Sequence, residues 1–515
     1  MGSLVAGDGQ ADGHPWRALA VCLVGGGMVL LDVSIVNVAL PSIRQGLGAP
    51  QSALQWVLSG YALAFGLALV PAGRLGDAFG RRRLFVLGLA LFTVCSVLCG
   101  SAQSASWLAL ARVAQGLSGG TLTPQITAVI QQLFQGKDRG KAFGLYGSVI
   151  GLSTAVGPLL GGSLIQLFGQ QSGWRWVFFV NLPVGVVLLP LALRLLPGRD
   201  PDSRREREQL DPVGVIMLGL GLVVFLLPLV EEQQWSGRGK WLLIPLALAI
   251  LAGFIGWEFR YARTKYSLIP LMLLAKRSYA FGLGIALLYF AGFTPLFFVF
   301  TLYLQLGLHY SPLLAGLATI PFALGGAATA SLAGRSALRF GRPLVAAGLF
   351  LVCVALLVTR WASSVAPDNH TGWVTAIPLL LGGVGGGMVI SPNQTLTLSE
   401  VPERRAGSAG GLLQTAQRVG AAVGIAAVGS VFFAQLGTTI QRSASQGGRG
   451  GPAAALPYAL AFQHAIVVAA AFVALALVLA VVDIMVDRGR RGEDRAAQDT
   501  REAGSGAQRQ QARAR

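Results

Sequence analysis

A single acidic residue of this chain lies deep inside an apolar segment. Among the 22 Asp and Glu residues, Asp32 alone falls in the middle third of a stretch long enough to cross a membrane. An ionised carboxylate without a partner at that depth costs several kcal/mol, so such residues are functional candidates by default. The chemistry that one buried carboxylate offers is the binding and release of a proton.

Arg112, in a later apolar segment, is the candidate partner of Asp32. Asp32 lies eight residues from the outer end of its segment, and Arg112 lies about five residues from the outer start of its own. With a helical rise of about 1.5 Å per residue, the two depths are about 12 and 8 Å. The side chains could therefore meet directly, through water or through Gln115. A static structural ion pair is the competing interpretation.

The elements that must position this pair are membrane spans. Hydrophobic residues make up 53% of the chain and charged residues 12%, against about 25% charged residues in soluble domains. This composition excludes a multi-domain soluble enzyme and predicts an all-α polytopic membrane protein. Fourteen apolar stretches are long enough to cross a bilayer, namely 17–40, 52–73, 84–104, 107–133, 141–167, 175–196, 212–230, 241–261, 278–306, 312–334, 343–361, 372–398, 406–436 and 461–486.

The placement of the basic residues predicts the orientation of these spans. Loops after even-numbered spans carry 22 Lys and Arg residues, and loops after odd-numbered spans carry seven. Basic loops stay in the cytoplasm, so both termini are expected there. The net charge of +18 is then explained by topology, and we expect no nucleic-acid partner.

The sequence predicts no cofactor and no metal. The four histidines are scattered without zinc-ligand spacing, and the four cysteines lie within apolar spans, where they resemble small buried hydrophobes. No phosphate-binding GxxxxGK[ST] motif occurs, so ATP hydrolysis in this chain is not expected. A proton gradient is the expected source of energy.

The two halves of the chain share a repeated turn. Residues 72–81 and 333–342 are identical at six of ten positions, at an offset of 261. A second, weaker similarity relates Thr123-Pro124-Gln125 to Ser391-Pro392-Asn393. Both similarities keep the same orientation, which predicts two parallel six-span repeats with two spans inserted between them.

This plan and the segment Leu31–Pro41 resemble the 14-span drug:proton antiporter family of the major facilitator superfamily. The resemblance implies the major facilitator fold, with two six-helix bundles and two inserted central helices. The implied parts are a cytoplasmic N-terminal tail (1–16), an N-terminal bundle (17–196), a cytoplasmic linker with two extra helices (197–277), a C-terminal bundle (278–486) and a disordered cytoplasmic tail (487–515).

Two further motifs, in the turn after the second span and in the fifth span, also resemble those of this family. The turn after the second span resembles a cytoplasmic latch that closes in the outward-facing state, and its residues are Gly73, Asp77, Gly80 and Arg81. Asp77 can lie at the N-terminus of another helix, where the dipole and unpaired N–H groups favour its charge. In the second copy Leu338 replaces this acid, so we expect that turn to have lost most of its latch function.

The fifth span resembles the signature associated with exporters. Its residues are Gly147, Gly151, Gly157, Pro158, Gly161 and Gly162. Proline removes a helical hydrogen bond, and glycines let two backbones approach closely, which predicts a bent, closely packed gating helix. Packing without a gating role is the alternative.

The predicted function is proton-coupled export of a lipophilic drug or antibiotic by alternating access in the bacterial inner membrane. A cationic compound is one candidate substrate. Asp32 and Arg112 would couple the proton, and the protein would act as a monomer within the lipid bilayer. Weaker candidates for the substrate cavity are Asn37, Tyr61, Gln115, Asn393, Gln394, Gln414, Gln417 and Arg418. The alternatives are a dedicated exporter of one secondary metabolite, a nutrient transporter and a non-transporting membrane sensor.

Overall fold

The computed structural model describes residues 15–198, 211–230, 235, 237–261, 271–365, 370–445 and 455–513. Within these ranges every regular element is helical, which confirms the predicted all-α class. The predicted N-terminal tail and much of the predicted linker lie outside the described residues.

The first half forms a bundle in which two short helices make up the sixth member. Its helices are α1 (Pro15–Leu47), α2 (Gln51–Phe79), α3 (Arg81–Gly100), α4 (Ala105–Leu133), α5 (Gly136–Phe168), α6 (Gly173–Phe179) and α7 (Asn181–Leu195).

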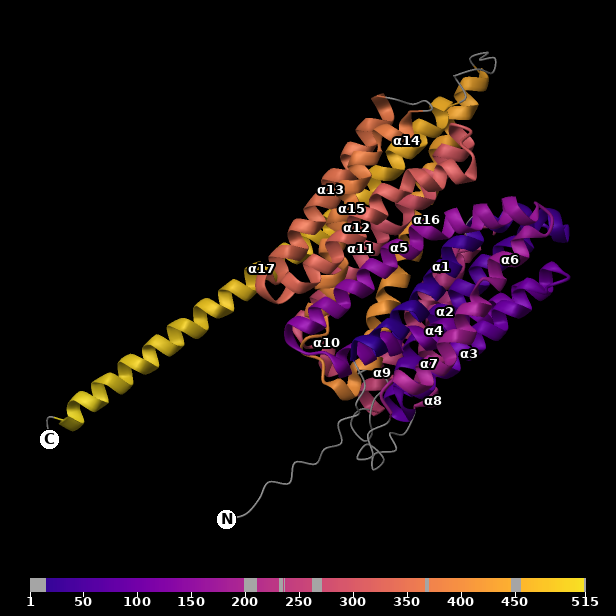
Figure 1. Ribbon diagram of the computed structural model, residues 1–515. Helices are drawn as coiled ribbons and strands as arrows, with labels where there is room; N and C mark the ends of the chain where they lie inside the picture. The colour runs from indigo at the N-terminus through magenta and orange to yellow at the C-terminus, as the bar shows by residue number, and fades with distance from the viewer. Residues whose placement is uncertain are drawn as a thin grey trace.

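The second half forms a matching bundle. Its helices are α11 (Arg277–Leu302), η3 (Tyr303–Gly307), α12 (Pro312–Phe340), α13 (Arg342–Val365), α14 (Thr371–Val374), α15 (Ala376–Thr397), η4 (Glu403–Arg405), α16 (Ala406–Ser445) and α17 (Ala455–Arg513). The two bundles lie side by side and spread apart toward the end that carries α6 and α14 (Figure 1). We call that the far end and the opposite end, which carries the Asp77–Arg81 turn, the latch end.

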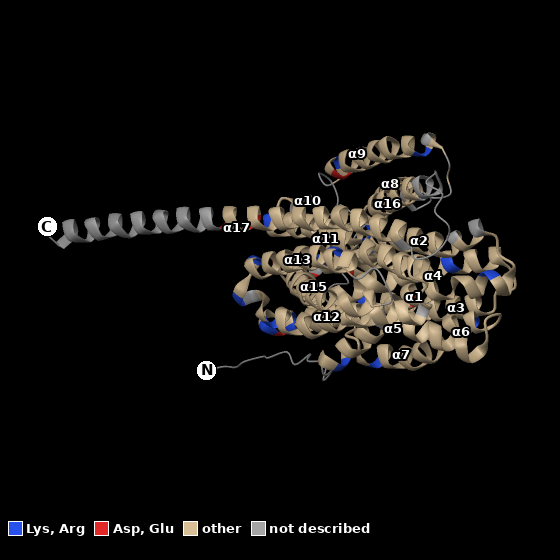
Figure 2. Cartoon of the chain, turned by 90° about the horizontal axis from the view of Figure 1, so that it is seen from above, with Lys and Arg blue, Asp and Glu red and all other residues tan. Residues whose placement is uncertain are grey.

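Between the bundles come α8 (Pro212–Val230), η2 (Arg238–Leu242), α9 (Leu243–Tyr261) and α10 (Leu271–Leu274). The helices α8 and α9 pack on each other, outside the bundles, and α8 contacts both α2 and α16 (Figure 2). Asp211 caps α8, because its Oδ1 accepts the Gly214 N–H at 2.9 Å and its Oδ2 accepts the Trp257 indole N–H at 2.7 Å.

Twelve helices of the described chain are long and apolar enough to cross a membrane, so the predicted count of fourteen is not supported. The difference lies in two helices. The described apolar part of α8 is short, at Val213–Pro228. The helix α4 is rich in polar side chains, including Arg112, Gln115 and Gln125, which are all buried among other helices.

Each copy of the repeated turn places a glycine with a positive φ between two helices. Gly80 (φ 103°) separates α2 from α3, and Gly341 (φ 59°) separates α12 from α13. A positive φ strains any residue with a side chain, so glycine lets each helix stop and the next begin at once. Lys and Arg gather near helix ends, while the middles of the bundles carry almost none (Figure 2).

The tail differs from the prediction. The helix α17 continues to Arg513, where a disordered tail from residue 487 is predicted. The segment is rich in Ala, Arg and Gln, which favour helix, so a polar composition does not prevent a helix from forming.

Candidate functional site

The structure places Asp32 and Arg112 in direct contact inside the first bundle. The Arg112 guanidinium donates to Asp32 Oδ2 at 2.6 Å. Both residues are buried, with 0% and 1% of their surface exposed. The contact joins α1 to α4, so the two side chains meet directly.

Other polar groups complete the shell around this carboxylate. Gln115 Nε2 donates to Asp32 Oδ1 at 3.0 Å, and Gln115 Oε1 accepts from Arg112 at 2.7 Å. Arg112 Nε also donates to the Val57 carbonyl of α2 at 3.1 Å, and its guanidinium lies 4.0 Å from the centre of the Tyr61 ring. Gln115 therefore orients the ion pair, in the place between Asp32 and Arg112 that the sequence suggested for it.

Two members of the site were missed by the sequence analysis. Asn181, at the start of α7, donates to Asp32 Oδ1 at 2.9 Å and to Ser96 Oγ of α3 at 3.2 Å. Gln115 Nε2 also donates to Ser96 at 2.8 Å. The signal available was an amide side chain at the head of a strongly apolar run. The site thus draws on α1, α2, α3, α4 and α7.

The latch residues join the two bundles at the latch end. Asp77 accepts from the backbone N–H groups of Gly407 and Ser408 at 3.0 and 2.9 Å, and from the Ser408 hydroxyl at 2.9 Å. These groups belong to the first turn of α16, where unpaired N–H groups and the helix dipole favour an anion. A Cβ on Gly73 would lie 2.3 Å from the Gly407 carbonyl oxygen, so only glycine allows this approach.

Arg81 strengthens the same closure. It donates to the Ala128 carbonyl of α4 at 2.9 Å and to the Glu403 carbonyl of the second bundle, and it lies 3.5 Å from Asp77. Gly80 supplies the break that turns the arginine toward these partners. The latch end is therefore closed in this structure.

The glycines of α5 serve two interfaces. Near the latch end, a Cβ on Gly147 would meet Ala330 at 3.2 Å, and one on Gly151 would lie 3.6 Å from the Ala323 carbonyl, both on α12 of the second bundle. Further along, Gly157 faces α1, where a Cβ would lie 1.8 Å from Ser34 Oγ.

The other predicted residues of α5 also contact α1 or α12, with one exception. A Cβ on Gly161 would lie 2.9 Å from Ile35 of α1, and Pro158 approaches Gly316 of α12. A Cβ on Gly162 would meet nothing within 4 Å, so that glycine is not required by packing. The helix thus contacts the Asp32 helix and the opposite bundle at once.

The predicted cavity residues divide into two groups. Gln414 and Arg418 lie where the bundles face each other: Gln414 donates to the Tyr146 hydroxyl of α5 at 3.3 Å, and Arg418 stacks over Phe65 of α2 at 4.5 Å. Gln417, beside Arg418 on α16, is half-buried. Tyr61 is buried beneath Arg112, at the edge of this interface.

The remaining cavity candidates lie elsewhere. Asn37 is exposed on α1 and donates to its own helix. Asn393 bonds within the second bundle, to Arg342 and to the Gly282 carbonyl, both at 2.9 Å, and its place in a substrate cavity stays a prediction. Gln394 is buried on the same helix. Arg342, the first residue of α13, donates to Asn393, and nothing in the sequence around Asn393 predicts this contact.

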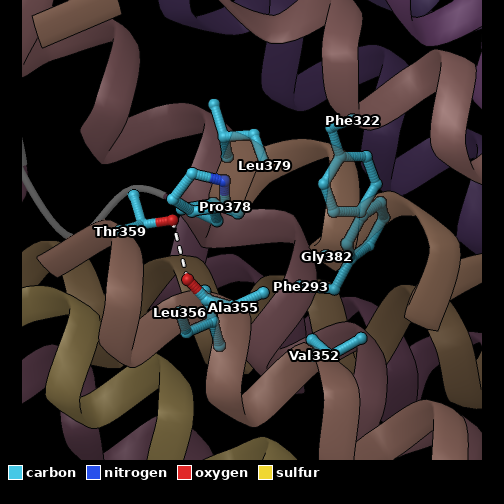
Figure 3. Close-up of a pocket in the computed structure, with 10 residues that line it drawn as sticks. Phe293, Phe322, Val352, Ala355, Leu356, Thr359, Pro378, Leu379 and Gly382 are labelled. Atoms are coloured by element: carbon cyan, nitrogen blue, oxygen red, sulfur yellow. Dashed lines mark hydrogen bonds between the residues drawn. The ribbon is translucent and has the colours of Figure 1, made fainter. Parts of the chain in front are cut away.

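A small apolar pocket lies within the second bundle, away from the Asp32 site (Figure 3). Phe293 and Phe322 form one wall, and Thr359 is its single polar lining side chain. The Thr359 hydroxyl donates to the Ala355 carbonyl of its own helix at 2.7 Å. The pocket therefore offers no polar group to a ligand and is a packing gap.

The two helical bundles expose Leu, Ile and Val on their outer faces, and one of them holds a buried charge pair. These features are those of a polytopic membrane transporter. The sequence profile of the Major Facilitator Superfamily matches residues 22–425. The chain belongs to this superfamily.

Curated relatives agree with this assignment over most of the chain. The probable actinorhodin transporter of Streptomyces coelicolor is 37% identical over 455 residues, covering 85% of this chain and 77% of the relative. The tetracenomycin C resistance and export protein of Streptomyces glaucescens is 34% identical, covering 82% and 77%. The solved structure of the human organic anion transporter MFSD10 has the same fold, with a TM-score of 0.62 at 17% identity, covering 90% and 99%.

Proposed function

We propose that this protein is a proton-coupled exporter of lipophilic drugs or antibiotics that works by alternating access, as a monomer, in the bacterial inner membrane. The observation that carries the proposal is the Asp32–Arg112 pair, with 2.6 Å between its charged atoms and no exposure of the carboxylate. Relatives named for antibiotic export and resistance support the direction and the substrate class.

Proton binding at Asp32 would change the contacts of the whole first bundle. A protonated carboxyl no longer attracts Arg112 by charge and gains an O–H donor, which changes the balance of hydrogen bonds among the groups that α2, α3, α4 and α7 contribute. The carboxylate is sealed here, so the proton exchanges in another conformation. Proton and substrate each bias the equilibrium by their different affinities for the two states.

The closed latch supports the proposal that this structure belongs to the outward-facing part of the cycle. The Asp77 contacts to α16 hold the latch end shut, and the loop charges favour a cytoplasmic position for that end and for both termini. Opening it requires the Asp77 hydrogen bonds to break and Gly73 to leave Gly407.

We further propose that α4 and α8 also cross the membrane, which gives the fourteen spans of the drug:proton antiporter branch. The 29 residues of α4 extend about 43 Å at 1.5 Å per residue, enough for a bilayer. Its polar side chains face α1, α2 and α3 instead of lipid, which makes its composition compatible with a span.

A dedicated exporter of one secondary metabolite is the second candidate function. It is favoured by relatives that are named after single compounds, including tetracenomycin C and cephamycin. The breadth of the transported panel separates it from multidrug export.

Everted membrane vesicles test the proposal. A pH gradient, acidic inside, should drive uptake by the wild-type protein of at least one compound from a panel that includes tetracenomycin C, puromycin and ethidium. Asp32→Asn should abolish this uptake, and the matched change Asp138→Asn, at an exposed acid in the first turn of α5, should leave it unchanged. Uphill uptake by Asp32→Asn would exclude Asp32 as the proton carrier, and no uptake of any compound by wild type would refute export.

A further inference from the structure

Arg418 differs in its partners from the buried and half-buried arginines that form ion pairs in the described chain. Arg81, Arg112, Arg277 and Arg342 each pair with a carboxylate of the described chain. Arg418 makes no ion pair or hydrogen bond with any residue that the structure describes, and the ionisable groups nearest to it are the phenols of Tyr61 and Tyr146. A cation in a membrane interior without a counter-charge is costly and marks a functional site.

The position of Arg418 faces the seam between the bundles. It lies on α16, is half-buried, and its guanidinium carbon is 4.5 Å from the centre of the Phe65 ring on α2. Gln414, one helical turn earlier, reaches Tyr146 of α5 across the same seam. A ligand between the bundles would thus meet one positive charge, amide groups and aromatic rings.

The aromatic rings connect this charge to the proton site. Phe65 stacks on Tyr61, with ring centres 5.9 Å apart and planes 23° apart. Arg112 lies 4.0 Å from the centre of the Tyr61 ring. The two cations are therefore linked through two stacked rings, so a ligand that draws Arg418 away from Phe65 alters the packing beside Arg112.

Asp32 offers no free charge to a cationic ligand at this place in the described part of the chain. Asp32 is fully buried, and both of its carboxylate oxygens already accept hydrogen bonds. The geometry therefore does not favour the cationic substrate that the sequence suggests.

We propose that Arg418 binds the negative charge of a flat aromatic acid, a carboxylate or an equally acidic phenol, whose rings lie against the Phe65 side of the seam. This inference rests on the proposed function and names its substrate class. A guanidinium fork matches a carboxylate with two parallel hydrogen bonds and also stacks on aromatic faces. A substrate anion would supply the counter-charge that Arg418 lacks in the described chain.

Equilibrium binding to the purified full-length protein tests the proposal without requiring transport. The probes are 2-naphthoate and 2-naphthamide, which share their shape and differ in charge, with 2-naphthylmethylammonium as the cationic member. Wild type should bind the naphthoate at least about tenfold more tightly than the amide, and Arg418→Gln should erase this preference while amide binding is unchanged. Arg418→Lys should retain part of it, and Arg360→Gln, at an exposed arginine remote from the seam, should retain all of it.

The possible outcomes separate binding from structure. A purely structural clamp predicts that Arg418→Gln weakens both probes equally, which would overturn the proposal. Wild type that prefers the ammonium or the amide, or that binds none of the three, would overturn it as well. A persisting naphthoate preference in a protein that transports nothing would refute export and leave the anion site standing.

Discussion

The two copies of the repeated turn both break at a glycine with a positive φ, and they have different partners. Gly73 and Gly334 each lie against a backbone carbonyl of the opposite bundle. A Cβ added at either glycine would lie 2.3 or 2.2 Å from the carbonyl oxygen. Arg81 continues toward the opposite bundle, whereas Arg342 turns into its own bundle and pairs with Asp483 at 2.8 Å. Close packing is thus kept twice and the polar latch once, so one carboxylate, Asp77, controls the closed end.

The buried acids of the two bundles differ in a related way. Asp32 has one arginine and two amides as partners. Asp483 lies between Arg277, at 3.1 Å, and Arg342, near the latch end of α17. Two cations around one carboxylate favour a permanent tie among α11, α13 and α17, whereas a one-to-one pair can exchange its arginine for a proton.

The largest expected effect separates these two acids. Asp32→Asn should lower gradient-driven transport by at least about a hundredfold, or about 2.7 kcal/mol, because the amide cannot carry the proton. Asp483→Asn should reduce it only through the amount of folded protein, measured by size-exclusion chromatography. Equal loss of coupling per folded molecule in the two variants would erase the distinction.

The second effect separates the two turns. Asp77→Asn removes an anion from the N-terminus of α16, which is worth about 1–2 kcal/mol, and should shift the population about tenfold toward an open latch end. Spin labels at positions 83 and 339, in a variant without the native cysteines, measure the opening. Arg342→Gln should leave the distance distribution unchanged, and an opening as large as that of Asp77→Asn would show that both turns latch.

A third, smaller effect compares two glycines of α5. Gly157→Ala places a methyl group 1.8 Å from Ser34 Oγ and 3.0 Å from the Ile35 nitrogen. Overpacking of this kind costs about 1–3 kcal/mol, so transport should fall about tenfold, with partial rescue by Ser34→Gly. Gly162→Ala, in open space, is the matched control, and a similar loss there would mean that helix flexibility matters more than close packing.

The smallest effect concerns the hydrogen bonds of Asp211 at the start of α8, outside both turns. Asp211→Ala removes the cap of α8, which is worth about 1 kcal/mol. We expect a slightly lower melting temperature and unchanged transport, measured in proteoliposomes. Loss of proton coupling in this variant would give the inserted helices a role that the comparison of the two bundles does not include.

The sequence predicted the Asp32–Arg112 contact because helical rise fixes depth and because charged residues are rare within spans. It also predicted the place of Asp77, since an acid in a tight turn seeks unpaired N–H groups. Asn181 and Ser96 escaped prediction because uncharged polar residues are common in spans, and the rotation of one helix against another is set by packing. The bond between Asn393 and Arg342 escaped prediction for the same reason, as Arg342 lies on another helix.

Proton movement driven by substrate tests the central claim most directly. Proteoliposomes without an imposed pH gradient, containing a pH-sensitive dye, would receive a steep gradient of a transported compound. Wild type should move protons against the direction of the compound, and Asp32→Asn should move the compound down its gradient with no proton signal. A proton signal that persists in Asp32→Asn would contradict the assignment of Asp32 as the coupling residue.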